Sequence, residues 1–174
     1  MKIRIRNTAN TYGVVTKSLH WLLALSIIFM LVLGFWMHTG LWYTVHKSLG
    51  ITILLLMILR VIWTLCNPSP VFPKKVPLWM RIAARVTHFS LYILALIMPF
   101  SGWLMSSASG RSPQFWWLFK WSLPWVNNNR SLAMSSNSLH NLLAWVLISV
   151  VLLHILADLK HHFIDKDGIL KRML

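Results

Sequence analysis

Four apolar runs, each long enough to cross a bilayer, dominate this chain of 174 residues. They cover approximately residues 19–37, 46–66, 79–106 and 139–162. A hydrocarbon core of about 30 Å needs roughly 20 mostly apolar residues in a helix, and each run meets that need. The runs and their short tails leave no room for a soluble catalytic domain of ordinary size. The sequence therefore predicts an all-α integral membrane protein, a single domain over residues 1–174 that forms a four-transmembrane-helix bundle.

The charged residues are few, mostly positive and unevenly placed. The formal net charge is +14, and the three acidic residues are all Asp. Of the 17 cations, four lie on the side of the bilayer where runs one and two, and runs three and four, are joined: Lys47, Arg111, Lys120 and Arg130. The other thirteen lie on the opposite side, so the positive-inside rule places both termini in the cytoplasm. Topology and attraction to anionic lipid explain the charge, and nucleic acid is not an expected partner.

The predicted outer loop, residues 107–138, is dense in aromatic side chains: Phe115, Trp116, Trp117, Phe119, Trp121 and Trp125. Indole is favoured at headgroup depth, so one interpretation is a segment that rests in the membrane interface. The other is a cover over a cofactor, on which an electron donor docks.

Histidines recur near the ends of the apolar runs, where an ionisable group is costly and calls for a reason. His140 and His154 are fourteen residues apart, which is about 21 Å and close to four full turns of helix, so they share a face. His46 lies at the depth of His140, and His20 at the depth of His154. Two histidine pairs at two depths suit bis-imidazole ligation of haem iron in a bundle core. For any one of them the alternative is a hydrogen bond between helices.

Two further residues fit the same hypothesis. Gly50 lies one turn after His46 and would let a flat ring approach the backbone closely. Arg60 lies fourteen residues after His46, on the same face and near the inner pair. It is either an arginine that extends to the interface from a helix end or the counter-charge of a haem propionate.

The segments "SLHW", "HKSLGITILLLMILR", "HFSLYILALIMPFSGW" and "LHNLLAWVLISVVLLHILADLKHHF" together resemble the bacterial di-haem cytochrome b561 family, from about Thr16 to the C-terminus. The resemblance implies a multi-pass protein of the bacterial inner membrane with two non-covalent haem b groups. His20 and His154 would ligate the inner haem iron, and His46 and His140 the outer one. His88 is a rival of His20 by depth, and His38 a weaker rival of His46.

His161 and His162 follow the last run at the inner surface. They are either solvated interfacial side chains or, as the matching "HH" of the family implies, a site that binds a quinone carbonyl or relays its proton. Quinone reduction consumes protons, and histidine titrates in the useful pH range.

The predicted function is electron transfer between a donor at the outer face and ubiquinone, which makes the chain a quinone-linked oxidoreductase. The outer face carries four cations and no acid, so it should attract anionic donors, of which superoxide is one candidate. The alternative is a haem-bearing membrane anchor subunit of a larger oxidoreductase complex. A non-haem metal enzyme of the desaturase type is disfavoured because the histidines divide between two faces, and a proton-driven carrier because no carboxylate lies deep in a run.

Overall fold

The computed structural model describes residues 4–37, 40–73 and 75–174. The described residues form four long helices: α1 (Val14–Trp36), α2 (Leu41–Leu65), α3 (Leu78–Ala108) and α4 (Arg130–Lys160). All four are long and apolar enough to cross a membrane, so the predicted four-helix membrane fold is confirmed. A π-helical turn, η1 (His161–Asp165), and a 3-10 turn, η2 (Leu170–Arg172), follow α4.

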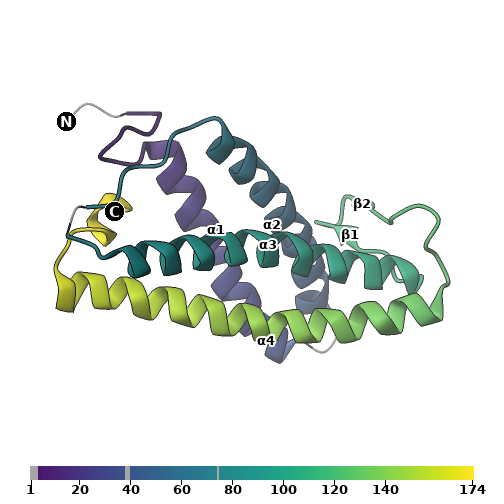
Figure 1. Ribbon diagram of the computed structural model, residues 1–174. Helices are drawn as coiled ribbons and strands as arrows, with labels where there is room; N and C mark the ends of the chain where they lie inside the picture. The colour runs from purple at the N-terminus through teal and green to yellow at the C-terminus, as the bar shows by residue number, and fades with distance from the viewer. Residues whose placement is uncertain (1–3, 38–39, 74) are drawn as a thin grey trace.

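The helices alternate in direction along the chain, and both termini lie at one end of the bundle (Figure 1). We call this the terminal end, and the opposite end, with the α1–α2 and α3–α4 connections, the loop end. Helices α3 and α4 run side by side along their length, and α1 and α2 cross them steeply (Figure 1). Two cavities, described below, lie between these helix pairs.

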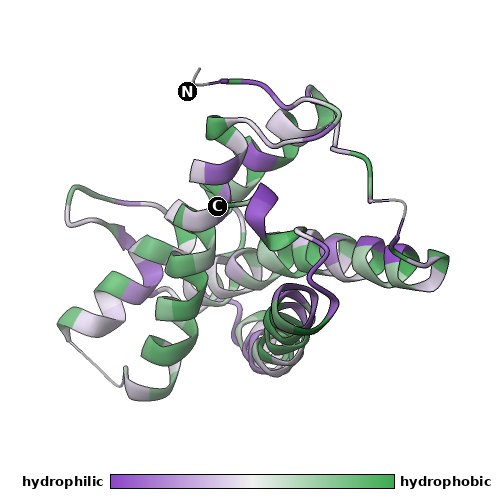
Figure 2. Cartoon of the chain, turned by 90° about the vertical axis from the view of Figure 1, so that its left-hand side faces the viewer, coloured by the Kyte–Doolittle hydropathy of each residue, from purple (hydrophilic) through white to green (hydrophobic). Residues whose placement is uncertain are grey.

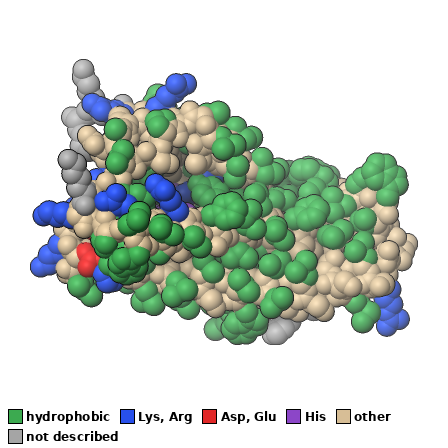
Figure 3. Space-filling view, in the orientation of Figure 1, with side chains coloured by type: hydrophobic (Ala, Val, Ile, Leu, Met, Phe, Trp, Pro, Cys, Tyr) green, Lys and Arg blue, Asp and Glu red, His purple; other side chains and the backbone are tan. Residues whose placement is uncertain are grey.

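The apolar side chains point mostly outward. A small core of Leu23, Ile53, Met57 and Ala95 is buried between the helices, whereas Leu153 on α4 is 63 % exposed. The helices are hydrophobic along most of their length (Figure 2), and apolar side chains cover the middle of the molecule (Figure 3). Because a water-soluble bundle would bury such side chains, the outer surface is one that lipid would cover.

Positive side chains gather at the terminal end, where the one visible acidic group also lies (Figure 3). Three contacts close this end. Asn7 accepts hydrogen bonds from the Gly13 amide and the Thr16 hydroxyl, and the Trp63 indole donates to Thr16. The uneven charge is thus a feature of the folded molecule, and the cytoplasmic location of this end remains a prediction.

At the loop end, part of the predicted aromatic loop forms a small hairpin of β1 (Gln114–Phe115) and β2 (Phe119–Lys120). Ser48 of α2 donates to the Gln114 carbonyl and accepts from the Trp116 amide, which ties the hairpin to the bundle. Helix α4 begins at Arg130, upstream of the predicted start at residue 139, because the Asn129 side chain accepts a hydrogen bond from the Leu132 amide and caps it.

Candidate functional site

Two cavities lie between the helices of the described part of the chain. The loop-end cavity measures about 700 Å³ and the terminal-end cavity about 350 Å³. Both fall in the usual range for cofactor sites, and apolar side chains with a few converging polar groups line them. Ile27, Ala95 and Leu147 line both cavities, so a wall one side chain thick separates them at these positions.

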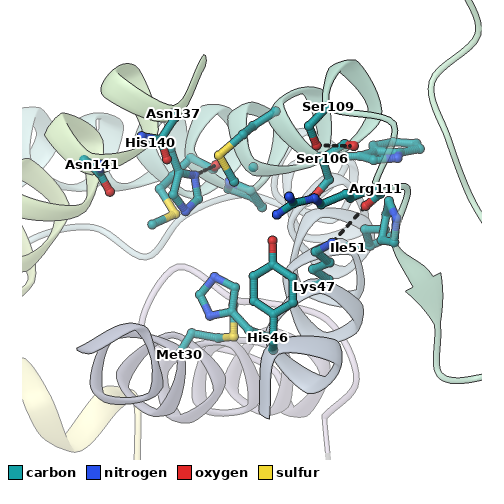
Figure 4. Close-up of a pocket in the computed structure, with 18 of the residues that line it drawn as sticks. Met30, His46, Lys47, Ile51, Ser106, Ser109, Arg111, Asn137, His140 and Asn141 are labelled. Atoms are coloured by element: carbon teal, nitrogen blue, oxygen red, sulfur yellow. Dashed lines mark hydrogen bonds between the residues drawn. The ribbon is translucent and has the colours of Figure 1, made fainter. Parts of the chain in front are cut away.

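In the loop-end cavity, His46 of α2 faces His140 of α4 (Figure 4). Their ring centres are 6.3 Å apart, and the ring planes are inclined at 75°. Cationic and amide side chains stand around the pair at the wall: Lys47, Arg111, Arg130, Asn137 and Asn141. The Lys47 ammonium donates to the Arg111 carbonyl, 2.8 Å away, which fixes one cation at the cavity wall.

The two outer histidines differ in how they are held. Nδ1 of His140 lies 3.0 Å from the Met98 carbonyl oxygen and 3.0 Å from the Ser101 hydroxyl, both on α3. Nδ1 of His46 is buried and has no hydrogen-bond partner among the described residues. A buried polar atom without a partner is costly, so the His46 ring is suited to an interaction that a bound group supplies.

In the terminal-end cavity, His20 of α1 and His154 of α4 form the corresponding pair. Their ring centres are also 6.3 Å apart, with planes inclined at 83°. His88 of α3 lies closer to His154, at 5.2 Å between ring centres. The structure thus brings three histidines together at this end. The ring separation distinguishes the His20–His154 pair from the His88–His154 pair.

The spacing can be compared with the chemistry of metal ligation. A metal–imidazole bond of about 2 Å, with the ring centre roughly 1.1 Å behind the nitrogen, places two rings on opposite sides of one metal about 6 Å apart. The pairs His46–His140 and His20–His154 match this separation. The His88–His154 pair, at 5.2 Å, is too close. In each cavity, therefore, one histidine pair has the ring separation that two imidazole ligands of a single metal need.

Arg60 lines the terminal-end cavity and has two hydrogen-bond partners there. Its Nη2 lies 3.1 Å from Nδ1 of His20, and its Nε donates to the Tyr92 hydroxyl at 3.2 Å. The Tyr92 hydroxyl also contacts the Thr64 hydroxyl, at 3.1 Å. The guanidinium therefore lines the cavity beside a candidate ligand. Asp158, 3.6 Å from Nε2 of His154, lines the same cavity.

The C-terminal tail covers the terminal-end cavity. Leu170 lines the cavity, the Trp21 indole donates to the Met173 carbonyl, and Arg172 donates to the Val71 carbonyl.

Burial raises the pKa of Tyr12, which lies just before α1, so its phenol stays neutral at physiological pH.

The remaining predicted site residues take the following positions. Gly50 lines the loop-end cavity, and a methyl group there would meet only the end of Met30, at 3.6 Å. Nδ1 of His161 lies 2.5 Å from the Asp167 carboxylate, and the His162 ring packs edge-on against Phe163. Neither His161 nor His162 lines the two cavities. His38 lies outside the described residues.

Sequence reasoning missed the contributions of α3, namely Met98, Ser101, Gly102 and Tyr92. The small pair Ser101–Gly102, just after Pro99 and inside an apolar run, is the only signal that the sequence offers for the first three. Tyr92 gives none, because its role depends on how α2 and α3 pack.

Membrane-spanning helices that surround paired histidines in cofactor-sized cavities define a membrane cytochrome of the b type. Comparison with known proteins agrees with this class. The chain belongs to the prokaryotic cytochrome b561 family, whose family model matches residues 11–174. It is therefore a multi-pass bacterial membrane protein that binds haem b and transfers electrons.

Three relatives illustrate the match. The chain is 37 % identical to "Cytochrome b561 homolog 2" of Escherichia coli (strain K12), over 97 % of this chain and 93 % of that protein. It is 32 % identical to "Probable superoxide oxidase CybB" of Yersinia pestis, over 94 % and 95 % of the two chains. It is 30 % identical to "Cytochrome b561 homolog 1" of Escherichia coli (strain K12), over 74 % and 72 %.

Proposed function

We propose that this protein holds two haem b groups, one in each cavity, and carries electrons between a donor at the loop end and ubiquinone near the terminal end. The observation that carries the proposal is the pair of 6.3 Å separations, His46–His140 and His20–His154, at two levels of one bundle. When bound, haem supplies one-electron redox chemistry, and two histidine ligands leave no open position at the iron.

At the loop end, His46 and His140 would hold the haem iron. His140 keeps its proton on Nδ1 by donating to the Met98 carbonyl, which leaves Nε2 as the metal-binding nitrogen. Gly50 leaves the cavity wall flat at one position. Apolar side chains such as Ile27, Leu31 and Leu147 line much of the cavity wall and suit the flat apolar macrocycle.

At the terminal end, His20 and His154 would hold the haem iron, and Asp158 lies 3.6 Å from Nε2 of His154. Arg60 carries a positive charge in the same cavity and suits a propionate carboxylate. The 5.2 Å separation from His154 argues against His88 as the second ligand and favours a role beside the cofactor.

The loop end suits a small anionic donor. Its cations are Lys47, Arg111, Lys120 and Arg130, and all three acidic residues of the chain lie at the other end. Positive potential raises the encounter rate of anions. Superoxide is our proposed donor, and one relative bears the printed name "Probable superoxide oxidase". Oxidation of two superoxide anions to two molecules of dioxygen releases two electrons, which with two protons convert one quinone to a quinol.

The protons would come from the terminal end. We propose that this end faces the cytoplasm and that the protein lies in the bacterial inner membrane, and the positive-inside rule supports this orientation. Nδ1 of His161 is paired with the Asp167 carboxylate, which leaves Nε2 available to a quinone carbonyl. His162 is the second candidate for this step.

A haem count tests the two-haem proposal. A pyridine haemochrome assay on the purified protein should give two b haems per chain. His140→Ala and His154→Ala should each retain one haem per chain. The haem retained in one variant should differ in its reduced spectrum from the haem retained in the other. One haem in the unmodified protein, or no loss in either variant, would overturn the assignment.

A second experiment tests donor and acceptor. Enzymatically generated superoxide should reduce a soluble ubiquinone analogue in the presence of the protein, and added salt should slow this reaction because it screens the loop-end cations. His161→Ala or His162→Ala should slow it without loss of haem. Unchanged rates in both variants would show that His161 and His162 are solvated side chains with no part in quinone reduction. Co-purification with a partner subunit would favour the alternative role, a membrane anchor subunit of a larger complex.

A further inference from the structure

The ring of His140 is held from one side by a short stretch of α3. Nδ1 lies 3.0 Å from the Met98 carbonyl oxygen and 3.0 Å from the Ser101 hydroxyl oxygen. The Ser101 hydroxyl is itself 2.6 Å from the same carbonyl oxygen, and Ser101 is 2 % exposed. The three polar atoms form a closed triangle away from solvent.

The protons in this triangle can be assigned by donor counting. A carbonyl oxygen only accepts, so the Ser101 hydroxyl and Nδ1 of His140 both donate to the Met98 carbonyl. Nδ1 therefore carries the proton, and Nε2 keeps its lone pair. Ser101 Oγ still has a lone pair that faces Nδ1, so the proton on Nδ1 is shared between two acceptors. The tautomer of His140 is thus set by α3 before any cofactor binds.

Gly102 makes the approach of the ring possible. A Cβ at this position would lie 2.9 Å from Cε1 and 3.2 Å from Nδ1 of His140, closer than side-chain carbons approach. Gly34, on α1, faces the other outer histidine, but a Cβ there would lie 3.9 Å from Cε1 of His46, which is ordinary contact. Of these two glycines, only Gly102 is required by the position of a histidine ring.

We propose that Ser101 and Gly102 are positioning residues, which fix the tautomer and the ring plane of His140 so that Nε2 faces His46 across the loop-end cavity. This inference rests on the proposed function, because it assumes that His140 is a haem ligand. Ser101 acts by sharing the Nδ1 proton, and Gly102 by leaving the space into which the ring packs. A hydrogen bond to the nitrogen that does not bind the metal orients a metal-ligating histidine and tunes the metal.

The matched substitutions Gly102→Ala and Gly34→Ala test the steric part. Both add one methyl group to a helix beside an outer histidine. Gly102→Ala should lower the haem content from two per chain to one and leave the same reduced spectrum as His140→Ala, whereas Gly34→Ala should retain both haems. Retention of both haems in Gly102→Ala with unchanged electron paramagnetic resonance (EPR) signals, or equal loss in the two variants, would overturn the proposal.

Substitutions of Ser101 test the hydrogen-bond part and serve if Gly102→Ala does not fold. Ser101→Ala should keep two haems but shift the low-field g value and the midpoint potential of one of them, and Ser101→Thr should restore both. A purely structural role would lower thermal stability and leave these two quantities unchanged, which would overturn the proposal. Failure of the proposed function is seen separately, as an unchanged haem content in His140→Ala.

Discussion

At the scale of single residues, ring separation distinguishes a candidate ligand from a neighbour. His88 and His20 both lie in the terminal-end cavity near His154, and neither depth nor residue type tells them apart. The separation does, because His20 is 6.3 Å from His154 and His88 only 5.2 Å. Both outer and inner pairs also have nearly perpendicular ring planes, at 75° and 83°.

This difference predicts opposite results for two alanine substitutions. His88→Ala should retain two haems per chain, because His88 is too close to share a metal with His154. His20→Ala should retain one. The pyridine haemochrome assay with oxidised and reduced spectra measures both, and the reverse pattern would move the ligand from His20 to His88.

At the scale of elements, α4 is the helix on which both candidate sites depend, because it carries His140 and His154. Its first turn is polar and lies in the stretch that was predicted to be loop. The side-chain oxygen of Asn129 holds that turn by accepting a hydrogen bond from the Leu132 backbone amide. The backbone amide of Asn129 donates to the Ala108 carbonyl at the end of α3. The cap thus fixes where α4 begins relative to α3.

Removal of this cap should destabilise the protein. Asn129→Ala should lower the free energy of unfolding by about 1 kcal/mol and the melting temperature by a few degrees. Asn127→Ala, an exposed position two residues upstream, is the control and should change little. Thermal unfolding in detergent, followed by circular dichroism, measures both, and equal effects would show that the cap contributes nothing.

At the scale of the whole molecule, charge and topology are linked. Lysine and arginine gather at the terminal end (Figure 3). All three acidic residues also lie there, so the only formal charges at the loop end are positive. The positive-inside rule predicts that the terminal end, with thirteen of the seventeen cations, faces the cytoplasm.

The single cysteine offers a direct test of that orientation. Cys66 is exposed at the terminal end of α2, so a membrane-impermeant maleimide added to spheroplasts should label it only after permeabilisation. Ser131→Cys in a Cys66→Ser background places the thiol at the exposed loop end of α4 and should be labelled at once. The opposite labelling pattern would invert the topology and move the proposed donor to the cytoplasm.

The number of membrane helices and the relative depths of the histidines could be predicted from the sequence, because they follow from local apolar length and helical rise. The sequence also suffices to group His46 with His140 and His20 with His154 by depth. The ring separations, the Arg60–Tyr92 contact and the space at Gly102 could not be predicted, because each depends on how residues of different helices pack in three dimensions. The early start of α4 was hidden for a related reason: in a polar stretch a cap and its partner helix, not hydrophobicity, decide where a helix begins.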